Sequence, residues 1–247
     1  MKKLMLLAAI ISLSTTAFAV EMKTMVQDNS VVKYNLKNSA KPGICSELAN
    51  ALMKTGDIKI SGLTSAAPLP RIESALEAGD IDVFLCLLKS DERAKKFNYI
   101  DVPLYQVNHV LVSMASDKTD VKSLDELKEI SKKETVMVPQ GSSLVKFLEE
   151  KGVTVDTSTK DELSSVKKLQ AGRGKFIYAQ DLSIISTLRD AGIDKSQMRF
   201  LPVTFKSEAQ YVAYSKKMNA DGVAKLKAAV EKLKASGELD KIVNSYK

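Results

Sequence analysis

The chain has 247 residues, of which 45% are hydrophobic and 27% charged, and its formal net charge is +7. This composition excludes a disordered chain, and 11 Gly and 6 Pro exclude a collagen-like or low-complexity body. Only five basic residues are Arg, and the chain has no Trp. Nucleic-acid surfaces favour clustered Arg with stacking aromatics, so no nucleic-acid partner is expected.

Residues 1–19 are typical of a secretory signal peptide. Lys2 and Lys3 precede an apolar run at 4–13, and residues 17–19 form an Ala-Phe-Ala cleavage site. The run is too short to span a bilayer, and no later run approaches the ~20 apolar residues that a membrane helix needs. We therefore expect a protein exported to the periplasm, without a membrane span.

Beyond this segment, strand and helix patterns alternate. Strands are expected at residues 22–26, 58–60, 81–88, 106–114, 136–138, 176–179, 198–203 and 210–214. Helices are expected from Gly43 onward and at residues 71–78, 123–131, 144–151, 160–170, 182–191, 221–236 and 238–246. The run 81–88 is apolar on both faces, which is typical of a covered central strand. The alternation predicts an α/β fold, whose ligands bind at the carboxyl ends of strands.

The small numbers of His and Cys limit the metal sites and catalytic triads that the chain could form. His109 is the only His, so no paired-His metal site and no Ser/His/Asp triad can be assembled, and a structural role is favoured for it. Cys45 and Cys86 are too few for a Cys-rich zinc site, although an oxidising compartment permits a disulfide between them. No metal and no cofactor are expected.

Four segments together carry a family resemblance. RIESALEAGDIDVFLC at residues 71–86 is followed by KSDERAKKFNYI at 89–100, Pro-Leu-Tyr at 103–105 and, at the C-terminus, LKASGELDKIVNSY at 233–246. These segments resemble the family 3 extracellular solute-binding proteins, the periplasmic receptors of polar amino-acid ABC transporters. The resemblance covers nearly the whole chain after residue 19.

This resemblance implies a two-lobed periplasmic-binding-protein-like fold, in which each lobe is a mostly parallel sheet flanked by helices. Lobe 1 would comprise residues 22–108 and 210–247, and lobe 2 residues 109–209. Two hinge crossings would let the lobes close on a small ligand. In this topology Cys45 and Cys86 lie on neighbouring elements of lobe 1, which predicts a disulfide; two buried free thiols are the alternative.

The resemblance also implies a carboxylate-binding element. Ser90 and Arg93 match the family's Thr/Ser-x-x-Arg, whose hydroxyl and guanidinium hold the ligand's α-carboxylate. A guanidinium presents a fixed fork of donors that suits a carboxylate. The alternative is an ion pair between Arg93 and Asp91 or Glu92 on an exposed turn.

Other positions match the family less specifically. Gly141, Ser142 and Ser143 match a Gly-Thr/Ser-Thr/Ser helix start, whose N–H groups would bind the same anion; an ordinary helix cap is the alternative. Tyr34 and Tyr105 match cleft or hinge aromatics, with the core as the alternative. Arg71 matches a position from which some members reach the cleft, with a solvated first-turn residue as the alternative.

Two positions depart from the family pattern. Cys45 stands where the family commonly has the Asp of Gly-Phe-Asp. The Asp that usually holds the ligand's ammonium is replaced by Gln180, and Asp181 matches only with a one-residue shift. A neutral Gln would hold an ammonium weakly, because a buried cation needs a compensating charge. A carboxylate ligand is therefore better supported than an amino acid.

Three classes of function remain. The resemblance favours a monomeric receptor that is not an enzyme and that delivers a small carboxylate or amino acid to an ABC permease or a sensor. An enzyme similar to cyclohexadienyl dehydratases is the second class, with Glu47 or Asp181 as its general acid. An interaction protein with a degenerate cleft is the third.

Overall fold

The computed structural model describes residues 19–28 and 30–247, so the predicted signal peptide, apart from Ala19, lies outside the described residues. The strands are β1 (Val20–Lys23), β2 (Val26–Gln27), β3 (Ile58–Ser61), β4 (Ala66–Ala67), β5 (Val83–Leu88), β6 (Asn98–Tyr99), β7 (Tyr105–Met114), β8 (Val136–Met137), β9 (Phe176–Gln180), β10 (Met198–Phe200) and β11 (Lys206–Tyr214). The helices are α1 (Ile44–Met53), α2 (Leu69–Ala78), α3 (Asp91–Lys96), α4 (Leu124–Ile130), α5 (Ser143–Glu150), α6 (Glu162–Gln170), α7 (Asp181–Asp190), α8 (Ala220–Ala235) and α9 (Glu238–Asn244), with a short 3₁₀ turn, η1 (Lys195–Gln197).

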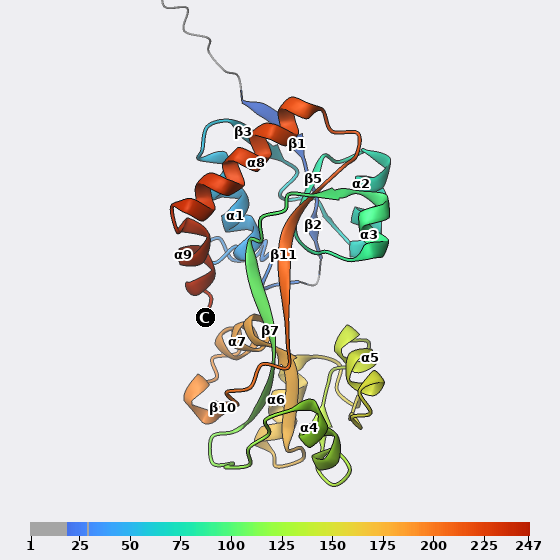
Figure 1. The fold of residues 1–247 in the computed structure, drawn as a ribbon. Coiled ribbons are helices and arrows are strands. Elements are labelled where there is room, and N and C mark those ends of the chain that lie inside the picture. Colours follow the sequence, from blue (N-terminus) through green and yellow to red (C-terminus); the bar gives the residue numbers. More distant parts are fainter. Residues whose placement is uncertain (1–18, 29) are drawn as a thin grey trace, which may run out of the picture.

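The molecule has two halves, joined by the long strands β7 and β11 (Figure 1). The upper half in Figure 1 contains both ends of the described chain, because α8 and α9 pack against α1, β1 and β3. The lower half contains α4, α5, α6 and α7. Segments that are distant in sequence therefore build one half, while the other comes from the middle of the chain.

The sheets are mixed, and the α/β expectation is confirmed. The largest sheet has the order β5-β11-β7-β9-β8, with β6 beside β11 and β10 beside β7. β11 is antiparallel to β5, β6 and β7, and β7 is antiparallel to β9 and β10. Parallel pairs are β1–β3, β2–β4 and β8–β9. The expected mostly parallel pairing is therefore corrected to a mixed one, because two oppositely directed strands run through the centre of the sheet.

The apolar core divides into three clusters of buried side chains. The first cluster contains side chains from the segment between β1 and β7, from the end of β11, and from α8 and α9. It also includes Leu182 from the start of α7. The other two draw on the distal part of β7, on β8 and β9, and on the helices α4 to α7. Five of the six residues of β5 are buried, as its apolar run predicted. Burying such side chains contributes about 1.5 to 3 kcal/mol each.

Candidate functional site

Arg93 lies just beyond the carboxyl end of β5, in the first turn of α3. Ser90 caps this helix, since its Oγ accepts a hydrogen bond from the Arg93 N–H at 3.3 Å. Arg93 donates from Nε at 3.0 Å and Nη2 at 2.7 Å to Glu73 Oε1, and from Nη1 at 3.1 Å to the Leu88 carbonyl. The acid that pairs with Arg93 is thus Glu73 of α2, rather than its exposed neighbours Asp91 and Glu92.

The guanidinium keeps binding capacity. A guanidinium has five N–H donors, and the described bonds of Arg93 use three of them. The side chains of Arg93 and Glu73 are 22% and 20% exposed. Tyr99 donates to the same Leu88 carbonyl at 3.0 Å, and burial is the main cause that raises the pKa of its hydroxyl to about 12. The strand end therefore presents a partly exposed cation that is paired with Glu73 and lies near the neutral Tyr99 hydroxyl.

Lys33, which the sequence analysis did not select, lies at the same strand end. Its Nζ donates to the Cys86 carbonyl at 2.9 Å and to Gln210 Oε1 at 3.2 Å. Gly43 lets the backbone of Lys33 pack against the start of α1, because a Cβ there would lie 2.3 Å from the Lys33 carbonyl oxygen. A Lys within the apolar-flanked run Val31-Val32-Lys33-Tyr34 was the only sequence signal that could have identified it.

The predicted disulfide between Cys45 and Cys86 is present, and it joins the first turn of α1 to β5 with a Cα separation of 6.1 Å. Cys86 has a φ of 63°, in the left-handed region that non-glycine residues rarely adopt. Across the ladder, the register of β11 shifts between Tyr211 and Ala213. The disulfide and this irregularity together fix the carbonyl that Lys33 contacts.

Both candidate tyrosines lie in the core beneath this strand end. Tyr34 is 5% exposed and donates to the Leu85 carbonyl at 2.8 Å. Tyr105 is 7% exposed, with its hydroxyl 3.7 Å from Cys45 Sγ. Burial is the main cause that raises the pKa of each hydroxyl. The structure thus places both in the alternative setting considered for them, the core.

The remaining candidates make no described side-chain hydrogen bond to Arg93. Gly141 has a φ of 75°, and Ser142 caps α5 by accepting from the Leu144 N–H at 3.2 Å, while Ser143 begins that helix. No hydrogen bond between described residues joins this turn to Arg93. Arg71 is exposed in the first turn of α2.

Gln180 and Asp181 stand at the position from which the family resemblance predicts contact with a ligand's ammonium group. Gln180 precedes α7 without a side-chain cap. Asp181 faces the crossing strand, because its Oδ1 accepts from the Asn108 N–H at 3.1 Å and its Oδ2 accepts from Asn108 Nδ2 at 2.9 Å. The acid closest to the family position is therefore engaged with β7.

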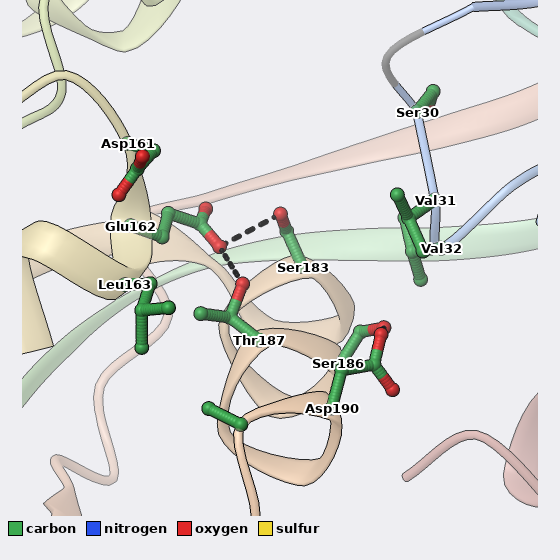
Figure 2. Close-up of a pocket in the computed structure, with 11 residues that line it drawn as sticks. Ser30, Val31, Val32, Asp161, Glu162, Leu163, Ser183, Ser186, Thr187 and Asp190 are labelled. Carbon is green, nitrogen blue, oxygen red and sulfur yellow. Dashed lines mark hydrogen bonds between the residues drawn. The ribbon is translucent and has the colours of Figure 1, made fainter.

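A cavity of about 440 Å³ separates Ser30–Val32 of the upper half from α6 and α7 (Figure 2). Glu162, another residue that the sequence analysis missed, is largely buried in its wall. Its Oε2 accepts from Ser183 and Thr187 at 2.9 Å each, and burial raises the pKa of its carboxyl. Asp161 and Asp190 also line the cavity. The side of the cavity formed by α6 and α7 is therefore acidic, whereas Lys33 follows directly after Val32 on the other side.

Glu47, a candidate general acid, and His109, the only His, both contact other side chains. Glu47 accepts from the Tyr246 hydroxyl at 2.6 Å, which ties α1 to the end of the chain. His109 is 2% exposed, with Nδ1 3.0 Å from the Tyr178 hydroxyl and Nε2 3.2 Å from Glu208 Oε2. Burial is the main cause that lowers its pKa. In residues 19–28 and 30–247, no His, Cys, Asp and Glu side chains form a group suited to a metal ion.

Several solved structures share the fold of this chain. The second substrate-binding domain of a putative amino acid ABC transporter from Streptococcus pneumoniae has a TM-score of 0.70 and 21% identity, covering 92% of this chain and 99% of that one. Substrate-binding domain 2 of Lactococcus lactis GlnP, in an open conformation, has a TM-score of 0.69 and 22% identity over 92% and 94%. The unliganded, open L-cystine solute receptor of Neisseria gonorrhoeae has a TM-score of 0.70 and 16% identity over 93% and 94%.

At these identities the likeness concerns the fold, which is the α/β fold of periplasmic binding proteins. No curated protein matches the chain. None of the helices in its described part is both long and apolar enough to cross a membrane. The model of the bacterial extracellular solute-binding proteins, family 3, matches residues 24–247. With the two-halved mixed α/β architecture, this match establishes that the chain belongs to the bacterial extracellular solute-binding proteins, family 3.

Proposed function

We propose that the protein is a monomeric periplasmic receptor that binds a small carboxylate between its two lobes and delivers it to an ABC permease or a sensor. It acts by binding rather than by catalysis. Lobe 1 comprises residues 22–108 and 210–247, and lobe 2 comprises residues 109–209. The amino-acid-binding neighbours and the family support a small organic ligand.

The observation that carries the proposal is the setting of Arg93. It follows the buried strand β5, which ends the order of the largest sheet; it is held in place by Glu73 and the Leu88 carbonyl, and two of its donors lack a described partner. A charge-assisted, two-donor contact to a carboxylate is among the strongest polar interactions available to a binding site. Ser142 and Ser143 on α5 would contribute hydroxyl and N–H donors from lobe 2 after closure.

Native mass spectrometry of freshly purified protein tests the proposal. We expect the wild-type protein to carry a retained small molecule with a carboxylate group, which Arg93→Ala loses. Removing the guanidinium leaves a desolvated carboxylate unpaired, so affinity for the identified molecule should fall by roughly 2 to 5 kcal/mol, or 30-fold to several thousand-fold in Kd.

Two further variants control this experiment. Arg93→Lys should recover only part of the affinity, because an ammonium cannot reproduce two parallel donors. Arg173→Ala removes an exposed Arg of lobe 2 and should leave affinity unchanged. Circular dichroism verifies that each variant folds. Full affinity in a folded Arg93→Ala protein would refute the assignment of the site.

A further inference from the structure

Lys33 is a largely buried cation that contacts only neutral acceptors. Its Nζ donates to the Cys86 carbonyl and to the side-chain oxygen of Gln210, which are both buried. Among the described residues, no Asp or Glu lies within ion-pair distance of its Nζ. A buried charge without a partner of opposite sign is costly, so such a group is a candidate for binding an anion from outside.

Lys33 and Arg93 share the carboxyl end of one strand. Lys33 binds the Cys86 carbonyl and Arg93 the Leu88 carbonyl, two residues further along β5. They are near enough for Arg93 to lower the pKa of Lys33, after burial as the larger cause, to about 8. At neutral pH both are charged, and Glu73 offsets one of the two charges. Together, the three side chains carry one uncompensated positive charge.

The acids of the opposite lobe already have partners of their own. Asp181 binds Asn108, and Glu162 accepts from Ser183 and Thr187, as the dashed lines in Figure 2 show for Glu162. Asp161 caps α6. Asp190 pairs with Arg189. These carboxylates have structural roles, and Gln180 is neutral, so an incoming ammonium would meet no acid committed to it.

We propose that Lys33 determines the specificity of the ligand site, which therefore selects carboxylates of net negative charge over neutral zwitterions. This inference rests on the proposed receptor function. A ligand of net charge −1 neutralises the combined charge of Lys33, Arg93 and Glu73, whereas a zwitterionic amino acid leaves that charge in place and brings an ammonium toward two cations.

Matched probe pairs measured by isothermal titration calorimetry at pH 7 test the role of Lys33. L-glutamate and L-glutamine are nearly isosteric but differ in net charge, as do L-lactate and L-alanine. We expect the wild-type protein to bind the anionic member of at least one pair ten-fold or more tightly than the neutral member. Lys33→Met should bring that ratio close to one, while Lys37→Met, which removes an exposed Lys from the same loop, should preserve it.

The pH dependence of binding is a second readout. In the wild-type protein, affinity for the anionic member should fall several-fold between pH 7 and 9.5, because Lys33 loses its proton in that range. Lys33→Met should show no such fall. A lysine that served only as a structural brace would change stability when replaced, without changing either the ratio or this pH profile.

These measurements distinguish failure of the specificity role of Lys33 from failure of the proposed receptor function. Arg93-dependent binding of the neutral members with equal or higher affinity, or a retained zwitterion of zero net charge in the native mass spectrum, would overturn the role of Lys33 and leave the receptor function intact. An unchanged ratio in Lys33→Met would do the same. Absence of any retained molecule and of any probe binding would overturn the receptor function and this inference together.

Discussion

At the scale of single residues, Arg93 and Lys33 show what a motif reveals and what it misses. Arg93 could be selected from sequence because it stands three residues after Ser90 beyond an apolar strand. Its partner Glu73 could not, because the pair spans 20 positions and depends on how α2 packs beside α3. Lys33 is 53 positions from the carbonyl it contacts, so its burial followed only from the tertiary fold.

The lowered pKa of Lys33 predicts an unusual stability profile for the ligand-free protein. The pKa is 10.5 in the unfolded reference and about 8 in the folded protein, so the unfolded chain binds more protons between these values. Stability therefore rises with pH across that range. Relative to Lys33→Met, the wild-type protein should gain about 2 to 3 kcal/mol in free energy of unfolding between pH 7 and 10.

Urea unfolding of both proteins at the two pH values measures this difference. Other groups that bind different numbers of protons in the folded and unfolded protein in this range contribute equally to both proteins, so the difference isolates Lys33. Parallel stability profiles for the two proteins would show that Lys33 is not desolvated in solution.

At the scale of elements, local pattern was sufficient for most helices and for β5, but it did not determine pairing. The expected strand at residues 22–26 divides into β1 and β2, which pair with β3 and β4 in separate sheets. Helix α3 was not predicted, because its six residues form too short a segment for helical periodicity to register. The left-handed backbone of Cys86 also lay beyond prediction, since it depends on the facing irregularity in β11.

The disulfide joins α1 to β5, so we expect it to contribute to the free energy of unfolding. It closes a loop with a sequence separation of 41 residues, for which chain entropy predicts a contribution of about 4 kcal/mol. Replacing both Cys45 and Cys86 by Ser should lower the free energy of unfolding by up to that amount in urea titrations.

Reduction of the wild-type protein should reproduce the loss, and the double variant should be insensitive to the reductant. If the reduced and oxidised wild-type proteins unfold at the same urea concentration, the bond does not contribute to stability in solution.

At the scale of the whole molecule, β7 and β11 join the two halves, and one cluster of polar side chains connects these strands to α7. Asn108 on β7 donates to Asp181 on α7, and its Oδ1 accepts from Ser207 on β11 at 2.7 Å. Both crossing segments were expected from their apolar and β-branched patterns, but this cluster involves residues 73 and 99 positions from Asn108. The sequence pattern therefore predicted strands at both positions, but not the side-chain contacts between them.

This cluster leads to a prediction about closure. Bending at β7 and β11 would change the position of α7 relative to β11, so the hydrogen bonds of Asn108 favour the arrangement described here. Asn108→Ala removes both side-chain bonds, which contribute about 0.5 to 1.5 kcal/mol for the neutral bond to Ser207 and about 1.5 to 3 kcal/mol for the bond to the Asp181 carboxylate, and should shift the ligand-free population toward more closed forms. In small-angle X-ray scattering, the radius of gyration of the ligand-free variant should lie between those of ligand-free and ligand-saturated wild-type protein.

Asn50→Ala, an exposed substitution on α1, is the control and should have the same radius of gyration as the wild-type protein. If the radius of gyration of the wild-type protein does not change with ligand, the protein does not close on its ligand. If only the radius of Asn108→Ala stays unchanged, the hydrogen bonds of Asn108 do not resist closure.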